Sequence, residues 1–155
     1  MLIRYNIRQR FGYGPTDRGP VGLVLRNWYV GSLSFEEGGA KLHFDDVPIG
    51  LLILNLLEEC MISIFRSSER SISWPIPELD AELTIRISNG VLWLSDEADL
   101  RSGGTPVRSL ASDAISSGYD VLSSIVAPDW ERFEKLGPSV YDSPILRRIF
   151  SLPYM

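Results

Sequence analysis

The stretch VPIGLLILNLLEECMISIF, residues 47–65, is the most apolar part of this 155-residue chain and limits the folds open to it. A membrane-spanning helix needs about 20 consecutive apolar residues, and here Asn55, Glu58 and Glu59 interrupt the run. A signal peptide stands at the N-terminus, where MLIRYNIRQRF has no apolar core segment. The stretch therefore predicts a central helix, about residues 47–66, that is buried on most sides in a cytoplasmic protein.

The polar residues of this helix recur at helical spacing and predict one narrow polar stripe: Asn55, Glu59, Ser63 and Arg66. Apart from this stripe, residues 51–57 and 60–65 are expected to be buried almost all round. Asp45 or Asp46 is placed to cap the start of the helix, and Pro48 suits its first turn.

Two pairs of turn residues predict β-hairpins on either side of the helix. Gly38-Gly39 and Asn89-Gly90 both suit the centre of a type I′ turn, because both central positions need a positive φ. Alternating apolar residues flank each turn, which is the period of a half-buried strand. The hairpins are expected to direct these residues inward: Leu33, Phe35, Leu42, Phe44, Leu83, Ile85 and Ile87.

Three further segments are predicted as strands. Residues 2–8 alternate between apolar and polar side chains, and residues 71–74 form a short strand that stops at Pro75. Residues 21–37 are long enough for two strands or for one strand bent at Gly31. A loop rich in glycine and proline is predicted over residues 9–20.

The last third of the chain has helical spacing of its apolar residues. Thr105 or Ser109 is expected to cap the first helix, Gly137 to end the second, and Ser143 with Pro144 to begin the third. The predicted helices are residues 105–126, 128–137 and 143–150.

This order of elements predicts an α+β fold. We expect a single antiparallel β-sheet of about five to seven strands, packed against the central helix and the C-terminal helices. The length of the chain and the absence of a long linker favour one domain over residues 1–155.

The charge is divided unevenly along the chain. Residues 1–35 carry five arginines against one acid, whereas residues 36–100 carry thirteen acids against four basic residues, and the net charge is -5. An acidic protein repels the phosphates of nucleic acid on average. We therefore expect no nucleic-acid partner and favour a basic protein partner, which an acidic surface attracts.

The sequence offers no catalytic or metal-binding constellation. With His43 as the single histidine and Cys60 as the single cysteine, a Cys/His zinc site has too few ligands, and a serine or cysteine nucleophile has no second imidazole to activate it. No phosphate-binding or dinucleotide-binding motif is present. We expect no metal and no cofactor, and binding is favoured over catalysis.

A compact, acidic, cytoplasmic α+β domain without a catalytic constellation resembles many bacterial immunity proteins, which bind and block a toxin. The resemblance implies an inhibitor that binds a partner protein such as a basic toxin. Arginine outnumbers lysine 13 to 2, which favours a GC-rich bacterial source. Acids, arginines and an aromatic residue are the candidates for the binding surface: Glu36, Glu37, Asp45, Asp46, Trp28, Arg4 and Arg8.

Two other functions stay open at this point. The chain is also compatible with a small enzyme whose carboxylate and arginine site the sequence does not expose, or with a structural or regulatory domain that self-associates, for example as a homodimer. The arginines at positions 4, 8 and 10 have a second interpretation as well. They are placed to form ion pairs across the sheet with Glu36, Asp45 or Glu82.

Overall fold

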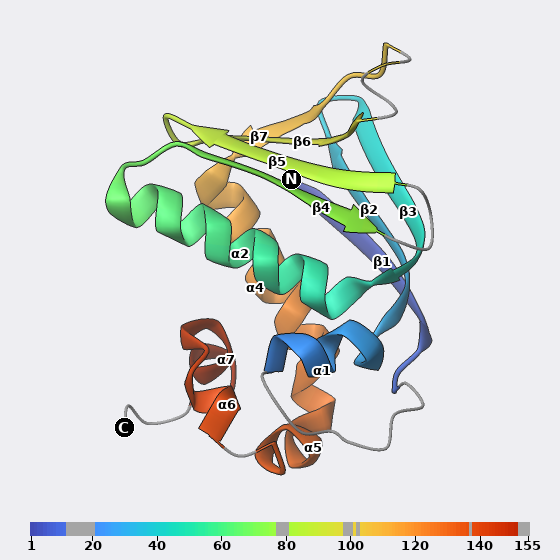
Figure 1. The fold of residues 1–155 in the computed structure, drawn as a ribbon, viewed down its shortest axis with the longest axis vertical. Helices are drawn as coiled ribbons and strands as arrows, with labels where there is room; N and C mark the ends of the chain where they lie inside the picture. Colours follow the sequence, from blue (N-terminus) through green and yellow to red (C-terminus); the bar gives the residue numbers. More distant parts are fainter. Residues whose placement is uncertain (12–20, 77–80, 98–100, 102, 137, 152–155) are drawn as a thin grey trace.

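The chain has an α+β fold with two antiparallel sheets and helices packed against them (Figure 1). The computed structural model describes residues 1–11, 21–76, 81–97, 101, 103–136 and 138–151. The predicted loop at residues 12–20 and the predicted helix end at Gly137 lie outside these residues.

The first sheet has three strands in the order β1-β2-β3, and the second has four in the order β4-β5-β6-β7. The strands of the first sheet are β1 (Leu2–Gln9), β2 (Val30–Glu37) and β3 (Ala40–Pro48). Those of the second are β4 (Arg70–Ile76), β5 (Ala81–Ser88), β6 (Val91–Asp96) and β7 (Val107–Leu110).

The helices precede, separate and follow these strands. They are α1 (Val21–Trp28), α2 (Ile49–Arg66), α4 (Ala111–Val126), α5 (Trp130–Glu134), α6 (Pro138–Tyr141) and α7 (Pro144–Ile149). A 3-10 turn, η1 (Ala127–Asp129), joins α4 to α5.

The prediction of a single sheet of five to seven strands is wrong, because the described residues form one sheet of three strands and another of four. β3 leads through Pro48 directly into α2, and the chain returns to β-structure only at Arg70. Strand β4 begins a second sheet, whose strands β6 and β7 lie beside β2 and β3 without joining their hydrogen-bonded ladder.

Both predicted hairpins are confirmed. Gly38 and Gly39 have φ values of 56° and 84°, and Asn89 and Gly90 have φ values of 51° and 74°. Leu33 lies opposite Phe44 and Phe35 opposite Leu42, as expected. The seven residues predicted to point inward are all buried.

Two segments differ from their predicted secondary structure. Residues 21–28 form helix α1 instead of a strand, because Leu25 and Trp28 recur at helical spacing and both enter the core. Residues 107–110 form strand β7 instead of the start of a helix, with Val107 and Ser109 facing inward. Thr105 and Ser109 consequently cap no helix, and α4 begins at Ala111.

Helix α2 is confirmed as the central helix, but its predicted cap is wrong. Its N-cap residue is Pro48, which makes no side-chain hydrogen bond, and the N–H group of Ile49 donates to the carbonyl of Tyr29 at 2.8 Å. The start of α2 is thus fixed by the chain that enters β2. The predicted start of α7 is correct, since Ser143 Oγ accepts a hydrogen bond from the N–H group of Leu146 at 3.3 Å.

Helices α2 and α4 lie side by side under the two sheets, and the shorter helices α1, α5, α6 and α7 lie below α2 in the view of Figure 1. One cluster of buried apolar side chains joins both sheets to both long helices. Gly118 of α4 allows their close approach, because a Cβ atom there would lie 2.8 Å from Leu57 Cδ2. In the described part of the chain, no helix combines the length and apolarity that crossing a membrane requires.

Candidate functional site

The four acids predicted to bind a partner each have a basic neighbour. Glu36 lies between Arg4, at 3.7 Å, and Lys41, at 3.4 Å. Glu37 pairs with the amino group of Met1 at 2.7 Å, and that ammonium, together with the hydroxyl of Ser109, lowers the pKa of the Glu37 carboxyl. Asp45 Oδ1 lies 2.9 Å from His43 Nε2, within hydrogen-bond distance. Asp46 forms an ion pair with Arg8 at 2.7 Å. These carboxylates are therefore partly neutralised within the first sheet.

Arg4 and Arg8, the predicted basic residues, also form ion pairs, whereas Trp28 is buried in the core. The ion pair of Arg4 with Glu36 confirms the cross-sheet interpretation, whereas Arg8 pairs with Asp46, which was not among the expected acids. Trp28 is only 2% exposed, and its ring packs edge-on against Phe133 at a centroid distance of 4.9 Å. Its side chain belongs to the core and not to the surface.

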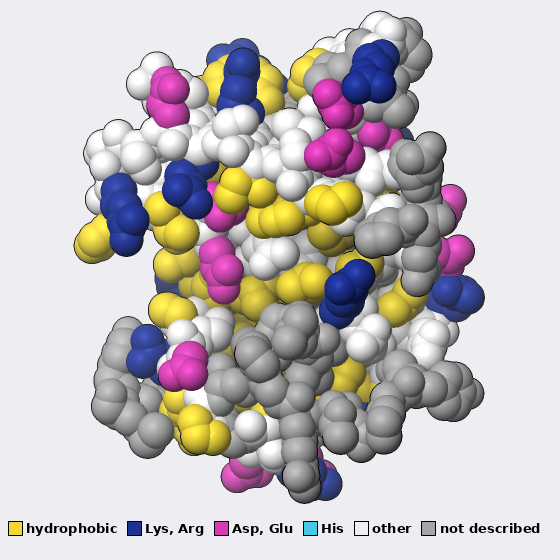
Figure 2. Space-filling view, in the orientation of Figure 1, with side chains coloured by type: hydrophobic (Ala, Val, Ile, Leu, Met, Phe, Trp, Pro, Cys, Tyr) yellow, Lys and Arg dark blue, Asp and Glu magenta, His cyan; other side chains and the backbone are white. Residues whose placement is uncertain are grey.

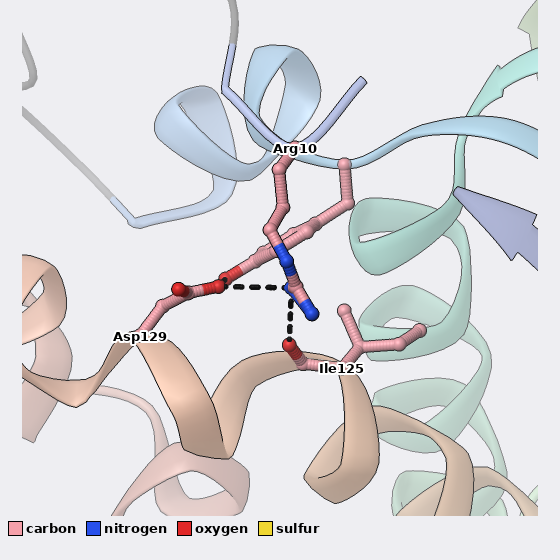
Figure 3. Close-up of polar contacts among 4 residues, drawn as sticks. Arg10, Ile125 and Asp129 are labelled. Carbon is pink, nitrogen blue, oxygen red and sulfur yellow. Dashed lines mark hydrogen bonds and ion pairs between the residues drawn. The ribbon is translucent and has the colours of Figure 1, made fainter. Parts of the chain in front are cut away.

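Arg10, unlike Arg4 and Arg8, belongs to a polar network at the end of α4 (Figure 3). Its Nη1 atom donates to the carbonyl of Ile125 at 3.2 Å and to Asp129 Oδ2 at 3.0 Å. The hydroxyl of Tyr29 donates to the same carboxylate oxygen at 2.8 Å. Because these groups satisfy one another, we assign the network to holding β1, β2 and α4 together and not to catalysis.

Replacing Tyr29 with phenylalanine tests this assignment. Loss of a buried hydrogen bond to a carboxylate is expected to lower the free energy of unfolding by about 1–2 kcal/mol at pH 7. Burial and the Asp129 carboxylate raise the pKa of Tyr29 above its ordinary value. The unfolded chain releases this proton near pH 10 while the folded chain keeps it, so the wild type loses stability as the pH rises above about 10. Urea unfolding at pH 7 and pH 10.5 should show the wild type approaching Tyr29→Phe at the higher pH, while Tyr5→Phe, at an exposed position, follows the wild type.

The polar stripe predicted for α2 faces solvent only in part, because Arg66 is exposed and Asn55 half-buried whereas the other two residues are not. Glu59 and Ser63 are buried and point toward β4. Arg70 donates to Glu59 from Nε at 2.7 Å and from Nη2 at 3.3 Å, and Ser63 Oγ donates to the carbonyl of Ser68 at 2.6 Å. The stripe therefore fixes the connection from α2 into β4.

The exposed side at the C-terminal end of α2 is apolar. Phe65 is 91% exposed and Ile64 is 46% exposed, although both were expected to be buried. Figure 2 shows hydrophobic side chains at the surface at this end of α2, on the left of the view, with Lys or Arg side chains beside them. A groove of about 470 Å³ opens here and is lined by Met61, Ile62, Ile64, Phe65, Arg66, Ile115, Tyr119 and Arg148. We call this surface the α2–α4 groove.

Three elements build the α2–α4 groove. The last turns of α2 supply most of the apolar side chains, α4 supplies Ile115 and Tyr119, and α7 supplies Arg148. The hydroxyl of Tyr119 lies 3.7 Å from Met61 Sδ, and the guanidinium of Arg148 lies 4.8 Å from the centre of the Tyr119 ring. These contacts hold Tyr119 in place between α2 and α7.

A second hollow of about 430 Å³ continues the groove along α4. It shares Ile115, Tyr119 and Arg148 with the α2–α4 groove and adds mainly polar side chains: Ser112, Ser116, Asp120 and Ser123. The apolar part of the surface thus has a polar extension on one side.

Cys60 lies in α2, close to the groove in sequence, but its side chain is fully buried. Burial, with a smaller effect of Glu59, raises the pKa of its thiol to about 12. We expect no measurable reaction of folded protein with Ellman's reagent at pH 8 over the minutes in which denatured protein reacts fully. Equal rates in the two states would show that the thiol is accessible.

Among the described residues, no three His, Cys, Asp or Glu side chains gather in a way that could hold a metal ion. Of the described residues that line the two hollows, Asp120 is the one acid, so the geometry of this surface suits contact with apolar groups.

The groove was missed because apolar residues continue along α2 as far as Phe65. The signal available in the sequence was the pair Ile64-Phe65 directly before the polar residues Arg66, Ser67 and Ser68. An apolar pair in the last turn of a helix is covered only if another element extends past that turn.

Comparison with protein-family models, with curated proteins and with solved structures finds no match to this chain, so the geometry alone carries the functional argument.

Proposed function

We propose that this chain is a small cytoplasmic protein-binding domain that holds a partner protein at the α2–α4 groove. The observation that carries the proposal is the exposure of Phe65 and Ile64 at the end of a helix that is otherwise largely buried. Contiguous exposed apolar surface rimmed by charged residues is typical of interaction sites.

Blocking a partner in the manner of an immunity protein is one form that this binding can take. The acids first expected to contact a basic partner are Glu36, Glu37, Asp45 and Asp46, and each already has a basic neighbour. A partner would have to compete with these contacts, whereas Ile64 and Phe65 of the groove are exposed apolar side chains. The groove is therefore the better supported binding surface.

Phe65→Ser tests this proposal without disturbing the fold. Because the side chain is 91% exposed, the free energy of unfolding is expected to change by no more than about 0.5 kcal/mol. Affinity purification from the source organism should recover a partner with the wild type and lose it with Phe65→Ser. Leu110→Ser, at another exposed apolar position, is the matched control and should keep the partner. Equal recovery with Phe65→Ser and the wild type would contradict the assignment of the groove.

A further inference from the structure

We infer that the α2–α4 groove takes an acidic amphipathic helix of a partner protein. This inference rests on the proposed function and adds the chemical class of the segment that is bound. Two properties of the groove support it, namely its position between helices and the sign of the charges that line it.

The shape of the groove favours a helical segment. Its apolar side chains come from two neighbouring helices, with Met61, Ile62, Ile64 and Phe65 on α2 and with Ile115 and Tyr119 on α4. The apolar strip covers the last turns of α2 and one turn of α4, and a short helix fills such a strip with residues spaced three and four apart.

The charge of the groove favours carboxylates on that helix. Arg66 of α2 and Arg148 of α7 are the charged residues that line it. In the described part of the chain, neither arginine has a carboxylate within ion-pair distance. Stacking on Tyr119 holds the guanidinium of Arg148 in place, and a guanidinium so held is suited to paired hydrogen bonds with a carboxylate.

The same charges argue against a second copy of this chain as the occupant. A two-fold contact through the groove would bring Arg66 and Arg148 of both copies together. The described residues that line the groove include no acid to compensate for this repulsion. A partner with acids beside its apolar residues meets no such repulsion.

The test is a selection of random 16-residue peptides displayed on phage, using the full chain as bait. Peptides are retained if they bind the wild type and Leu110→Ser but not Phe65→Ser. We expect the retained peptides to carry apolar residues three and four apart and to contain clearly more Asp and Glu than Lys and Arg.

A synthetic copy of one retained peptide then tests the two arginines directly. Arg66→Glu and Arg148→Glu combined should weaken binding by about three- to tenfold, as expected for two exposed ion pairs. Arg26→Glu, which changes an exposed arginine of α1, should leave the affinity unchanged. All variants are compared only after their melting temperatures are shown to match the wild type.

The other results separate the two proposals. Phe65-dependent peptides rich in Lys and Arg would overturn the acidic helix and leave the binding groove in place. A selection that yields no Phe65-dependent peptide would overturn both. A molecular mass that doubles with concentration in the wild type but not in Phe65→Ser would show that a second copy fills the groove. Peptide binding that begins only when the chain is shortened to end at Ser151 would show that its own C-terminal residues fill it.

Discussion

Leu54→Asp is expected to leave almost no folded protein. Leu54 lies in the middle of α2 and is 3% exposed within the apolar cluster that joins both sheets. A carboxylate there has no cation to pair with, and burying an unpaired charge costs several kcal/mol in addition to the packing that is lost. That cost approaches the whole free energy of unfolding of a domain, about 5–15 kcal/mol. Soluble yield and a thermal melt followed by circular dichroism measure the effect.

Two companion variants keep this prediction testable when the aspartate variant cannot be purified. Leu54→Ala should fold but lose about 2–5 kcal/mol in urea unfolding, because it leaves a cavity without adding a charge. Asn55→Asp adds the same charge at the next position, which is partly exposed, and should remain close to the wild type. A cooperative melt of Leu54→Asp near that of the wild type would contradict the central position of α2.

Arg70→Met should lower the melting temperature by about 5–10 °C, the second largest effect that we expect. The replacement keeps the aliphatic part of the side chain but removes both hydrogen bonds to Glu59. The Glu59 side chain is 11% exposed and would keep its charge inside the protein without a cation. Differential scanning calorimetry at pH 7 measures the change.

The double variant Glu59→Gln with Arg70→Met separates the buried charge from the other effects of the substitution. With the carboxylate neutralised, most of the lost melting temperature should return. Arg66→Met is the matched control, since it removes an arginine from the end of α2, four residues before Arg70, without affecting Glu59. A fall in melting temperature as large in Arg66→Met as in Arg70→Met would show that the ion pair is not the cause.

Local sequence signals predicted the hairpins, the central helix and the start of the last helix. Gly38-Gly39 and Asn89-Gly90 specify their turns because few residues adopt a positive φ without strain. Ser143 with Pro144 specifies a helix start in a similar way. In each case the determining interactions lie within a few residues of one another.

The errors arose where long-range packing decides the structure. The segment VGLVLRNW, residues 21–28, is rich in valine and leucine and is compatible with a strand, yet it forms a helix that places Leu25 and Trp28 in the core. Residues 107–110 form a strand because β6 offers them an open edge. The division into two sheets depends on pairing between hairpins that no local pattern encodes.

The candidate site was missed for a related reason. The apolar residues of α2 were expected to be buried throughout, but α4 and α7 do not cover Ile64 and Phe65. The polar residues Glu59 and Ser63 were expected to face solvent, but Arg70 of β4 pairs with Glu59, and the carbonyl of Ser68, in the turn before β4, accepts a hydrogen bond from Ser63. Whether a helix face is covered depends on the position of distant elements, which hydrophobic spacing alone does not report.

Photo-crosslinking from position 65 tests the α2–α4 groove most directly. Replacing Phe65 with p-benzoyl-phenylalanine keeps an aromatic ring at the exposed site, and irradiation in the source organism joins it to whatever protein occupies the groove. One dominant adduct is expected from position 65 if a partner binds the α2–α4 groove. It should be absent when the same group replaces Leu110, an exposed residue of β7. No adduct from position 65, or the same adduct from both positions, would contradict the binding of a partner at the α2–α4 groove.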